Sequence, residues 1–368
     1  MKTYYENLSN MHDIYEFWQQ AFMDSDSFAE YYFKEKCKDN RILTAYEEKK
    51  LVSMLFLNPY TMKFAQDILE SFYIVGVATH KDYRKRGYMR AILEKSLRDM
   101  AKEGVPFTFL MPANTAYYTP FQFSLLYETT LLKYKPLGSE EAACEHKKIN
   151  LVPLEGDFDK RLAQDIEAIV DKLSNLHCIR SEAYIKRLIK EAKSEGGELV
   201  LFKKAGAISG YFLYTLVQNK ASISQLIADF DVEEAIALVR SYLSNYSADF
   251  IIPNYLIKES MSDAAMEADK GIMFRALRPD KLLAMLRCQD KKELTISIVD
   301  PIITSNNKTY QWIIAPDFSE LRETNQKPSK VLTIEEVNEL VFGRGLMEGS
   351  KLFFKDKNKK SNLINENV

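Results

Sequence analysis

One segment, residues 75–93, constrains the fold of this chain more than any other. Its sequence is VGVATHKDYRKRGYMRAIL. An apolar strand pattern ends at Thr79, a short basic loop follows, and a helix pattern runs from about Tyr88 to Lys102 with apolar side chains every three or four residues. Gly104 follows as a stop signal for that helix. The segment therefore predicts a strand that leads through a tight basic turn into an amphipathic helix.

The loop Tyr83–Gly87 predicts a binding site for an anion. The first turn of a helix leaves backbone N–H groups without intrahelical partners, and the helix dipole favours negative charge beside them. Gly87 lets the backbone approach a ligand closely. Cationic side chains surround it, namely Arg84, Lys85, Arg86 and Arg90. A pyrophosphate suits these features, and a solvated basic turn in front of a helix is the other interpretation that the spacing leaves open.

Element patterns and polar stretches divide the chain into three predicted units. In the first unit we expect helices at 10–22 and 26–38, strands at 41–47, 50–57, 71–79, 106–111 and 127–134, and a turn at Asn58–Pro59. The polar stretch 138–148 marks the end of this unit. The first predicted domain therefore covers residues 1–140.

The second and third units follow with different signals. The second has helical patterns within 159–195, strands at 198–203 and 208–217 around Gly206, and a helix at 232–244. It repeats the first unit weakly and lacks the basic glycine loop. The third has strands at 293–299 and 308–315, and a helix that begins with the capping box Thr333-x-x-Glu336 and ends at Gly343. The predicted domains are 141–282 and 283–368.

Composition excludes several classes of protein. The 368 residues hold 50 Lys and Arg against 52 Asp and Glu, a formal charge of −2, which argues against a strongly basic nucleic-acid-binding protein. The four cysteines form no CxxC pair and the four histidines no HxxxH pair, so we expect a reducing compartment and no metal site. Residues 1–17 lack an apolar signal segment, and no run of about 18 apolar residues occurs. We therefore expect a cytoplasmic protein without nucleic-acid or membrane partners.

A family resemblance rests on two motifs and on the chain ending. The pattern V-x6-R-[KR]-R-G-x-x-R, from Val77 to Arg90, resembles motif A of the GCN5-related N-acetyltransferases (GNAT). Met89 stands where most of that family has a small residue, which is similar to the enhanced intracellular survival (Eis) branch. The segment PANTAYYTPFQF at 112–123 resembles the tyrosine segment of that branch, and the chain ends in LINENV as its relatives do. The resemblance extends over essentially the whole chain.

The resemblance implies a fold, an assembly and a cofactor. The fold is mixed α/β (α+β), with a catalytic GNAT domain at 1–140, a degenerate GNAT-like copy at 141–282, and a sterol-carrier-protein-like α+β domain at 283–368. The cosubstrate is acetyl-CoA, with no metal, and the assembly is a homo-oligomer, a hexamer in relatives. The implied acetyl-CoA-binding residues are Val77, Ala78, Thr79, Arg84, Lys85, Arg86, Gly87, Tyr88, Met89, Arg90, Ala113 and Asn114.

Catalytic roles follow from the same resemblance. Tyr118 would be the general acid, because a phenol with a pKa of about 10 keeps its proton at neutral pH. Packing is the ordinary role of a tyrosine, and Tyr117 is adjacent. The C-terminal carboxylate of Val368 would be the general base, and a disordered tail is the alternative for that end.

The acceptor side is less specific. Asp24, Asp26 and Glu366 are candidates to attract ammonium groups, although Asp24 and Asp26 would equally serve as caps of the second helix. The resemblance implies acetyl transfer from acetyl-CoA to primary amines of a multi-amine acceptor, such as an aminoglycoside, a polyamine or lysine. The amine would attack directly, without a covalent acyl-enzyme. The alternatives are a non-catalytic protein that binds CoA or a lipid, and a protein-lysine acetyltransferase.

Overall fold

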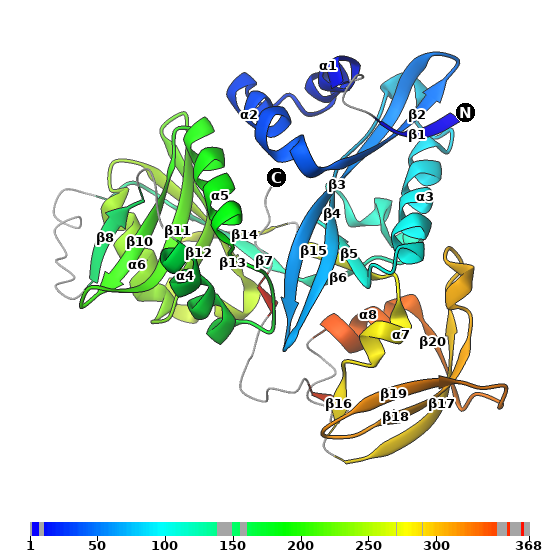
Figure 1. Ribbon diagram of the computed structural model, residues 1–368. Coiled ribbons are helices and arrows are strands. Elements are labelled where there is room, and N and C mark those ends of the chain that lie inside the picture. Colours follow the sequence, from blue (N-terminus) through cyan, green and yellow to red (C-terminus); the bar gives the residue numbers. More distant parts are fainter. Residues whose placement is uncertain are drawn as a thin grey trace. The chain divides into compact units, whose positions relative to one another are not determined.

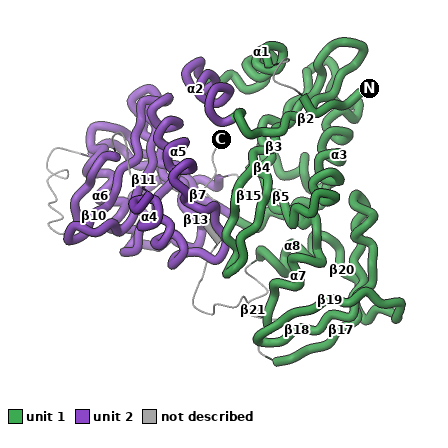
Figure 2. The backbone as a smooth tube through the Cα atoms, viewed as in Figure 1, with its two compact units in different colours: residues 1–24, 37–127, 271–359 green, residues 25–36, 128–270, 360–368 purple. Residues whose placement is uncertain are grey.

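The chain forms two compact units. The computed structural model describes residues 2–6, 11–137, 149–154, 160–269, 271–288, 290–343, 352–353 and 362–363 (Figure 1). Unit 1 contains residues 1–24, 37–127 and 271–359, and unit 2 contains residues 25–36, 128–270 and 360–368 (Figure 2). Unit 1 thus joins the start of the chain with most of its last quarter.

The sheet of unit 1 carries the predicted strand–loop–helix segment. Its strand order is β1 (Lys2–Tyr5), β2 (Arg41–Glu47), β3 (Lys50–Phe64), β4 (Asp67–Thr79), β5 (Phe107–Leu110), β15 (Ile272–Ala276) and β6 (Ser124–Tyr127). Neighbouring strands are antiparallel except β4 and β5, which are parallel. The helix α3 (Tyr88–Lys102) has the predicted bounds. Its Ile92, Leu93 and Leu97 are fully buried in one core cluster with Leu55 and Leu57 of β3.

The opposite face of the β3–β4 pair carries α1 (Met11–Phe22). The Trp18 ring lies edge-on to Phe56 of β3, with ring centroids 5.1 Å apart. Because side chains alternate along a strand, Phe56 points away from the face on which Leu55 and Leu57 meet α3. The first helix and α3 therefore cover two faces of the same pair of strands, as Figure 1 shows.

The rest of unit 1 follows the third predicted group of elements. Its sheet has the order β19 (Ser319–Glu323), β18 (Thr309–Ile314), β17 (Lys292–Val299) and β20 (Lys330–Thr333), beside α7 (Pro279–Leu283) and α8 (Ile334–Phe342). Thr333 and Glu336 form the predicted capping box at the start of α8, and Gly343 is its C-cap. A short strand, β16 (Arg287–Cys288), pairs with β21 (Leu352–Phe353).

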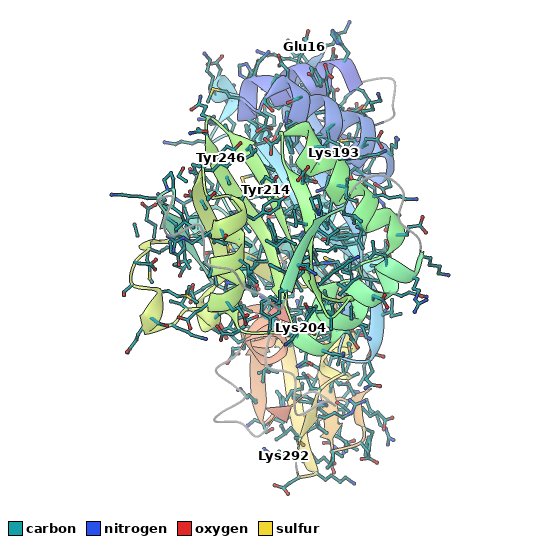
Figure 3. All side chains as sticks on the ribbon, turned by 90° about the vertical axis from the view of Figure 1, so that its left-hand side faces the viewer. Glu16, Lys193, Lys204, Tyr214, Tyr246 and Lys292 are labelled. Atoms are coloured by element: carbon teal, nitrogen blue, oxygen red, sulfur yellow. The ribbon has the colours of Figure 1, made fainter. Side chains whose placement is uncertain are left out.

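Unit 2 has a sheet whose strand order resembles that of the large sheet of unit 1. The strands run β14 (Ala265–Ala268), β7 (Thr129–Tyr134), β13 (Ser247–Pro253), β12 (Lys220–Ala228), β11 (Ala207–Val217), β10 (Glu198–Lys204) and β8 (Ile149–Pro153). The helices are α2 (Asp26–Tyr31), α4 (Lys160–Leu173), α5 (Glu182–Ser194) and α6 (Val232–Tyr242). On the face covered by α6, Tyr214 (Figure 3) stacks on Phe212 at 6.0 Å and lies edge-on to Tyr242 at 6.4 Å.

The helix of unit 2 that corresponds in order to α3 begins in an acidic environment. Asp231 caps α6 by accepting hydrogen bonds from the N–H groups of Glu233 and Glu234. Lys258 pairs with the carboxylates of Asp231 and Glu233. Because Asp231 already accepts from two N–H groups of the first turn, this helix start offers less to an anion than that of α3, which agrees with the predicted loss of the basic glycine loop in this unit.

Three sequence-based expectations about the elements are wrong. Asn58 and Pro59 do not form a turn but lie within β3, opposite Tyr73 and Phe72. Pairing of β3 with β2 ends at Leu57, so the missing N–H of Pro59 does not interrupt that ladder. The expected strand at 127–134 corresponds mainly to β7, while its first residue, Tyr127, ends β6, and these two strands belong to different sheets.

The third expectation concerned the helix at 26–38. The α-helix ends at Tyr31, a π-helical turn follows (Tyr32–Lys36), and a 3₁₀ turn completes the segment (Cys37–Asp39). The predicted boundary stretch 138–148 lies outside the described residues.

Candidate active site

Strands β4 and β5 part from each other soon after they meet. They pair only at Phe72 with Thr108 and at Tyr73 with Phe109. The Thr108 hydroxyl donates to the Phe72 carbonyl at 2.7 Å and fastens this short contact. Strand β4 continues to Thr79, and in the described part of the chain no strand pairs with its β5-facing edge beyond Tyr73. That edge offers backbone groups to an extended ligand.

A β-bulge redirects the end of β4. The register passes from Met54 opposite Ala78 to Phe56 opposite Val75, so β4 holds one extra residue. Gly76 lies within this extra stretch with φ +62°. A Cβ on Gly76 would lie 2.5 Å from the Trp18 ring, so glycine is required both by conformation and by space. Bulges of this kind re-aim strand ends beside active sites.

Hydrogen bonds fix the end of β4. The Ser53 hydroxyl donates to the Ala78 carbonyl at 2.7 Å and lies 2.9 Å from the Thr79 hydroxyl. The N–H of His80 donates to the Val52 carbonyl at 2.9 Å. Arg84 Nε donates to the Thr79 carbonyl at 3.3 Å and closes the basic loop onto the strand. The predicted residues 77–79 therefore stand at a rigid strand end.

The first turn of α3 faces open space. Gly87 is the N-cap with φ +86°, and a Cβ built on it would meet nothing within 4 Å. The first backbone bond of the helix runs from the Ala91 N–H to the Gly87 carbonyl at 3.0 Å. The N–H groups of Tyr88, Met89 and Arg90 therefore have no acceptor within the helix. Together with the helix dipole they form the anion site that the sequence predicts.

The cations of the loop make exposed contacts. The Arg86 guanidinium lies 5.1 Å from the centre of the Tyr83 ring and 3.9 Å from the Glu47 carboxylate. Arg90 lies 5.0 Å from the centre of the Phe121 ring and pairs with Glu94 at 3.0 Å. Exposed pairs of this kind contribute little to stability. Arg86 and Arg90 can therefore exchange these contacts for a bound anion at small cost in free energy.

An open groove of about 770 Å³ borders the same loop. Its lining residues are Glu47, Glu48, Lys49, Lys50, Tyr83 and Arg86. The lining mixes both charges, so it favours no single class of ligand. We assign no ligand to this groove.

Tyr118 occupies a buried position between two 3₁₀ turns, Thr115–Tyr117 and Thr119–Phe121. Its side chain is 7% exposed, whereas that of Tyr117 is 58% exposed. Burial, with a smaller effect of Tyr117, raises the pKa of Tyr118 to about 12. No hydrogen bond joins its hydroxyl to another residue in the described ranges. The phenol therefore keeps its proton at neutral pH and has that proton available.

One core cluster brings several predicted site residues together. Tyr118 and Tyr88 belong to it, and Val77 and Met89 pack against it. The end of β4, the first turn of α3 and the turn at residues 115–121, here called the tyrosine turn, thus share one hydrophobic core. Their relative positions are fixed by packing within unit 1.

The other predicted residues have local roles or fall elsewhere. Ala113 and Asn114 are exposed, and the Asn114 side chain accepts from the Ala116 N–H at 2.9 Å, which shapes the turn before Tyr118. The half-buried Asp24 accepts from the Trp18 indole N–H at 2.8 Å. Asp26 is exposed in the first turn of α2.

The cap of α2 is neither of the two aspartates. Ser25 accepts from the Phe28 N–H at 3.2 Å and is the N-cap. Asp24 belongs to unit 1 and Asp26 to unit 2. Glu366 and Val368 lie outside the described residues.

Comparison with known proteins identifies the first part of the chain. Residues 6–126 match the acetyltransferase (GNAT) domain family. The chain carries a GNAT acetyltransferase domain. This confirms the predicted enzyme class, acetyl transfer by a GNAT domain. A comparison with curated proteins found no match.

Solved structures share the mixed α/β fold of this chain over nearly its whole length. A GCN5-related N-acetyltransferase from Anabaena variabilis has a TM-score of 0.76 at 16% identity, covering 99% of both chains. A probable N-acyltransferase from Enterococcus faecalis has a TM-score of 0.76 at 16% identity, covering 96% of this chain and 93% of that chain. Eis1 from Mycobacterium abscessus has a TM-score of 0.69 at 14% identity, covering 100% of both. These likenesses confirm the mixed α/β fold.

The GNAT domain implies acetyl-CoA as the cosubstrate, and the residues present suit it. The open space at Gly87 and the three N–H groups behind it fit a pyrophosphate. The unpaired edge of β4 fits an extended pantetheine arm. Over the described ranges, no cluster of three or more His, Cys, Asp or Glu side chains could hold a metal ion. None of the described helices is long and apolar enough to span a membrane.

Proposed function

We propose that this GNAT domain transfers the acetyl group of acetyl-CoA to a primary amine of a small multi-amine acceptor. The observation that carries the proposal is the Tyr118 hydroxyl, which is protonated, unpaired among the described residues, and packed in one core with the anion-binding helix. Acetyl-CoA supplies the activated acetyl group. The chain's own residues hold it and manage the protons.

The binding residues divide by chemical group. The backbone of Val77, Ala78 and Thr79 would lie along the pantetheine arm, and one N–H there would stabilise negative charge on the attacked carbonyl oxygen. The loop Arg84–Gly87 and the first turn Tyr88–Arg90 would hold the pyrophosphate. Ala113 and Asn114 would border the cofactor. Ala113 has no hydroxyl to offer, which leaves backbone contacts there.

Tyr118 would act as the general acid. The amine nitrogen forms a bond to the carbonyl carbon, the carbon–sulfur bond breaks, and the departing sulfur takes the Tyr118 proton. Solvent then restores that proton. A phenol with a pKa of about 12 remains protonated throughout the physiological range, so the acid is always loaded.

The C-terminal carboxylate of Val368 would accept the ammonium proton, directly or through water. This role rests on the family resemblance. The strand β22 (Asn362–Leu363) pairs in parallel with β9 (Leu176–Cys178) within unit 2.

Further expectations remain parts of this proposal. They are the domain limits 1–140, 141–282 and 283–368, a sterol-carrier-like third domain, a hexameric assembly, a cytoplasmic location and the absence of a metal. Asp24, Asp26 and Glu366 remain proposed acceptor contacts. The hydrogen bond from Trp18 gives Asp24 a structural partner in addition, so Asp24 is the weaker candidate for a substrate contact.

A kinetic test uses adjacent tyrosines. Tyr118→Phe removes the acid, so kcat should fall about 100-fold while KM for acetyl-CoA changes little. Tyr117→Phe is the matched control, because Tyr117 is exposed, and its kcat should stay near that of the unmodified enzyme. Steady-state thiol release measures both. Unchanged turnover in Tyr118→Phe would remove Tyr118 from the mechanism.

Two other functions are alternatives for the same site. A protein lysine would present the same primary amine, so a protein acceptor is an alternative substrate. A non-catalytic protein would bind CoA or a lipid without releasing thiol. The protonated hydroxyl of Tyr118 in the core beside the anion site favours catalysis over binding alone.

A further inference from the structure

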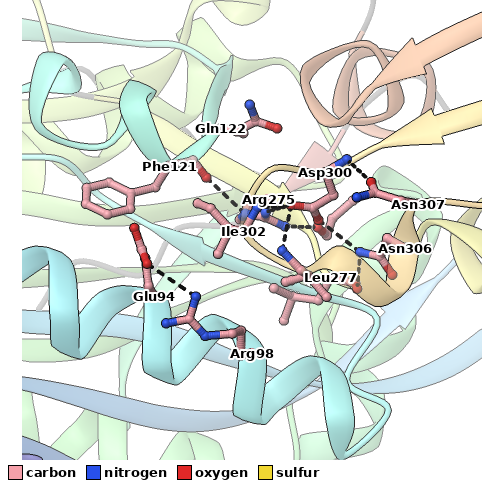
Figure 4. A network of polar contacts seen from close by, with 12 residues as sticks. Glu94, Arg98, Phe121, Gln122, Arg275, Leu277, Asp300, Ile302, Asn306 and Asn307 are labelled. Atoms are coloured by element: carbon pink, nitrogen blue, oxygen red, sulfur yellow. Dashed lines mark hydrogen bonds and ion pairs between the residues drawn. The ribbon is translucent and has the colours of Figure 1, made fainter.

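The strand β15 brings a buried charge into the sheet that carries Tyr118. Arg275 of β15 and Asp300 are both fully buried, and their side chains pair at 2.8 Å (Figure 4). The same guanidinium donates through Nε to the Phe121 carbonyl at 2.9 Å. Phe121 ends the 3₁₀ turn that follows Tyr118. A residue far along the chain therefore holds the tyrosine turn by its backbone.

Asp300 is itself held in place by several donors. It accepts from the N–H groups of Ile302 and Ile303 at 2.9 Å each and from Asn306 Nδ2 at 2.9 Å. With these bonds and the Arg275 pair, the carboxylate is firmly oriented. The guanidinium group of arginine is planar, so pairing it with a fixed carboxylate also fixes the orientation of its other N–H groups. The geometry therefore places Arg275 Nε at the Phe121 carbonyl with little freedom.

A second buried side chain holds the next carbonyl. Asn338 of α8 is fully buried, and its Nδ2 donates to the Gln122 carbonyl at 2.9 Å. The same nitrogen lies 3.0 Å from the Ser124 hydroxyl and 3.2 Å from the Phe274 carbonyl, and its Oδ1 accepts from the Ala276 N–H at 2.8 Å. Gln122 has φ +64°, a left-handed backbone conformation that residues other than glycine adopt infrequently.

The turn held in this way is bonded to Tyr118. The N–H groups of Phe121 and Phe123 point to the Tyr118 carbonyl at 2.9 and 3.5 Å. The Phe123 ring lies edge-on to the Tyr118 ring at 6.0 Å. The Phe121 ring also contacts the first turn of α3, because the Arg90 guanidinium lies 5.0 Å from the ring centre. Each contact links the buried pair to the tyrosine or to the anion site.

We propose that Arg275 and Asn338 are positioning residues that fix the Tyr118 hydroxyl relative to the anion-binding turn. The inference rests on the proposed acid role of Tyr118. Stability alone does not account for the arrangement, because well-packed apolar residues often replace a buried ion pair without loss. The pair instead imposes direction on two carbonyls next to a proton donor, where a displacement of about 1 Å costs about 100-fold in rate.

The test is a double-mutant cycle of Asn338→Ala with Tyr118→Phe. We expect Asn338→Ala to lower kcat at least 10-fold with little change in KM for acetyl-CoA. In the Tyr118→Phe background the same change should alter kcat less than 2-fold, because there is no hydroxyl left to position. Thr44→Ala is the matched control for stability. It removes a buried hydroxyl that donates to the Glu6 carboxylate at 2.5 Å and lies 3.3 Å from the Tyr4 carbonyl, away from the turn, and should leave kcat unchanged.

The outcomes separate the two claims. If Tyr118→Phe leaves kcat unchanged, the proposed acid role fails and the positioning role fails with it. If Tyr118→Phe lowers kcat but Asn338→Ala lowers it equally in both backgrounds, the acid role stands and the positioning role is wrong. If Asn338→Ala does not fold, Arg275→Lys takes its place in the cycle. That change keeps a cation beside Asp300 but loses the fork that reaches Phe121.

Discussion

At the scale of single residues, burial separates two adjacent tyrosines that look alike in sequence. Tyr117 is largely exposed, while Tyr118 is enclosed by the cluster that includes α3. Burial raises the pKa of Tyr118 to about 12. The sequence motif selected Tyr118 by counting from Pro112, and the structure supplies the physical difference.

The raised pKa leads to a prediction about pH. Burial disfavours the charged phenolate, so Tyr118 should stay protonated until about pH 12. Loss of the acid should therefore not lower kcat near pH 10, where an ordinary tyrosine ionises. The measurement is kcat against pH at saturating substrates, with a stability check at each pH. A falling limb centred near pH 10 that is absent in Tyr118→Phe would contradict the assignment.

The sequence predicts the roles of residues that belong to a short local motif. It does not predict the roles of residues whose partners are distant in sequence. Gly87 and the capping box of Thr333 are each recognisable within four positions of sequence. The capping box is confirmed, and Gly87 is the N-cap of α3, while its binding role stays a prediction. Arg275 and Asn338 contact carbonyls about 150 and 216 positions away. The one local signal for the burial of Arg275 was its position as a charged residue within the apolar run GIMFRAL.

At the scale of elements, the β4–α3 unit was the most predictable part of the fold. Its helix bounds are confirmed because the apolar period, the N-terminal glycine and the stop glycine agree with one another. The turn predicted at Asn58–Pro59 is wrong because proline also occurs inside strands, at positions where a backbone N–H is not needed for pairing. That exception depends on where β2 ends, which local sequence does not reveal.

Two glycines at opposite ends of α3 provide a matched pair. Gly87 and Gly104 both have φ +86°. Alanine at either position should cost about 1 kcal/mol of unfolding free energy, because L-residues disfavour this conformation. Only Gly87→Ala should also weaken CoA binding, since only Gly87 stands at the anion site. Thermal unfolding and CoA titration by calorimetry would test this.

The contrast between the two variants decides the outcome. Gly104→Ala should bind CoA as the unmodified protein does, although its added Cβ approaches the flexible end of Lys281 at 3.1 Å. Equal losses of CoA affinity in both variants would show that general destabilisation, and not the anion site, explains the effect.

At the scale of the whole molecule, strands are exchanged between the two sheets along the chain. Strand β7 follows β6 in sequence but belongs to the sheet of unit 2, and β15 follows the strands of unit 2 but lies between β5 and β6. The three predicted domains follow the order of the chain and therefore do not include this exchange of strands. Pairing partners more than 140 residues apart leave no local pattern.

The end of the chain offers a prediction at the same scale. A short Gly-Ser extension after Val368 converts the terminal carboxylate into a peptide bond and moves the charge away. We expect kcat to fall at least 10-fold while CoA binding stays unchanged. The same extension placed before Met1 is the control and should have no effect. Full activity of the C-terminally extended enzyme would exclude the carboxylate of Val368 as the base.

The most direct test of the account is thiol release from acetyl-CoA by the enzyme with a free C-terminus, against a panel of amines. The panel holds aminoglycosides, polyamines, lysine derivatives and a basic peptide, and mass spectrometry identifies the product. The account predicts turnover with several multi-amine compounds and the addition of one acetyl group to a nitrogen. Measurable CoA binding without turnover of any amine in the panel would contradict it and would favour a binding protein.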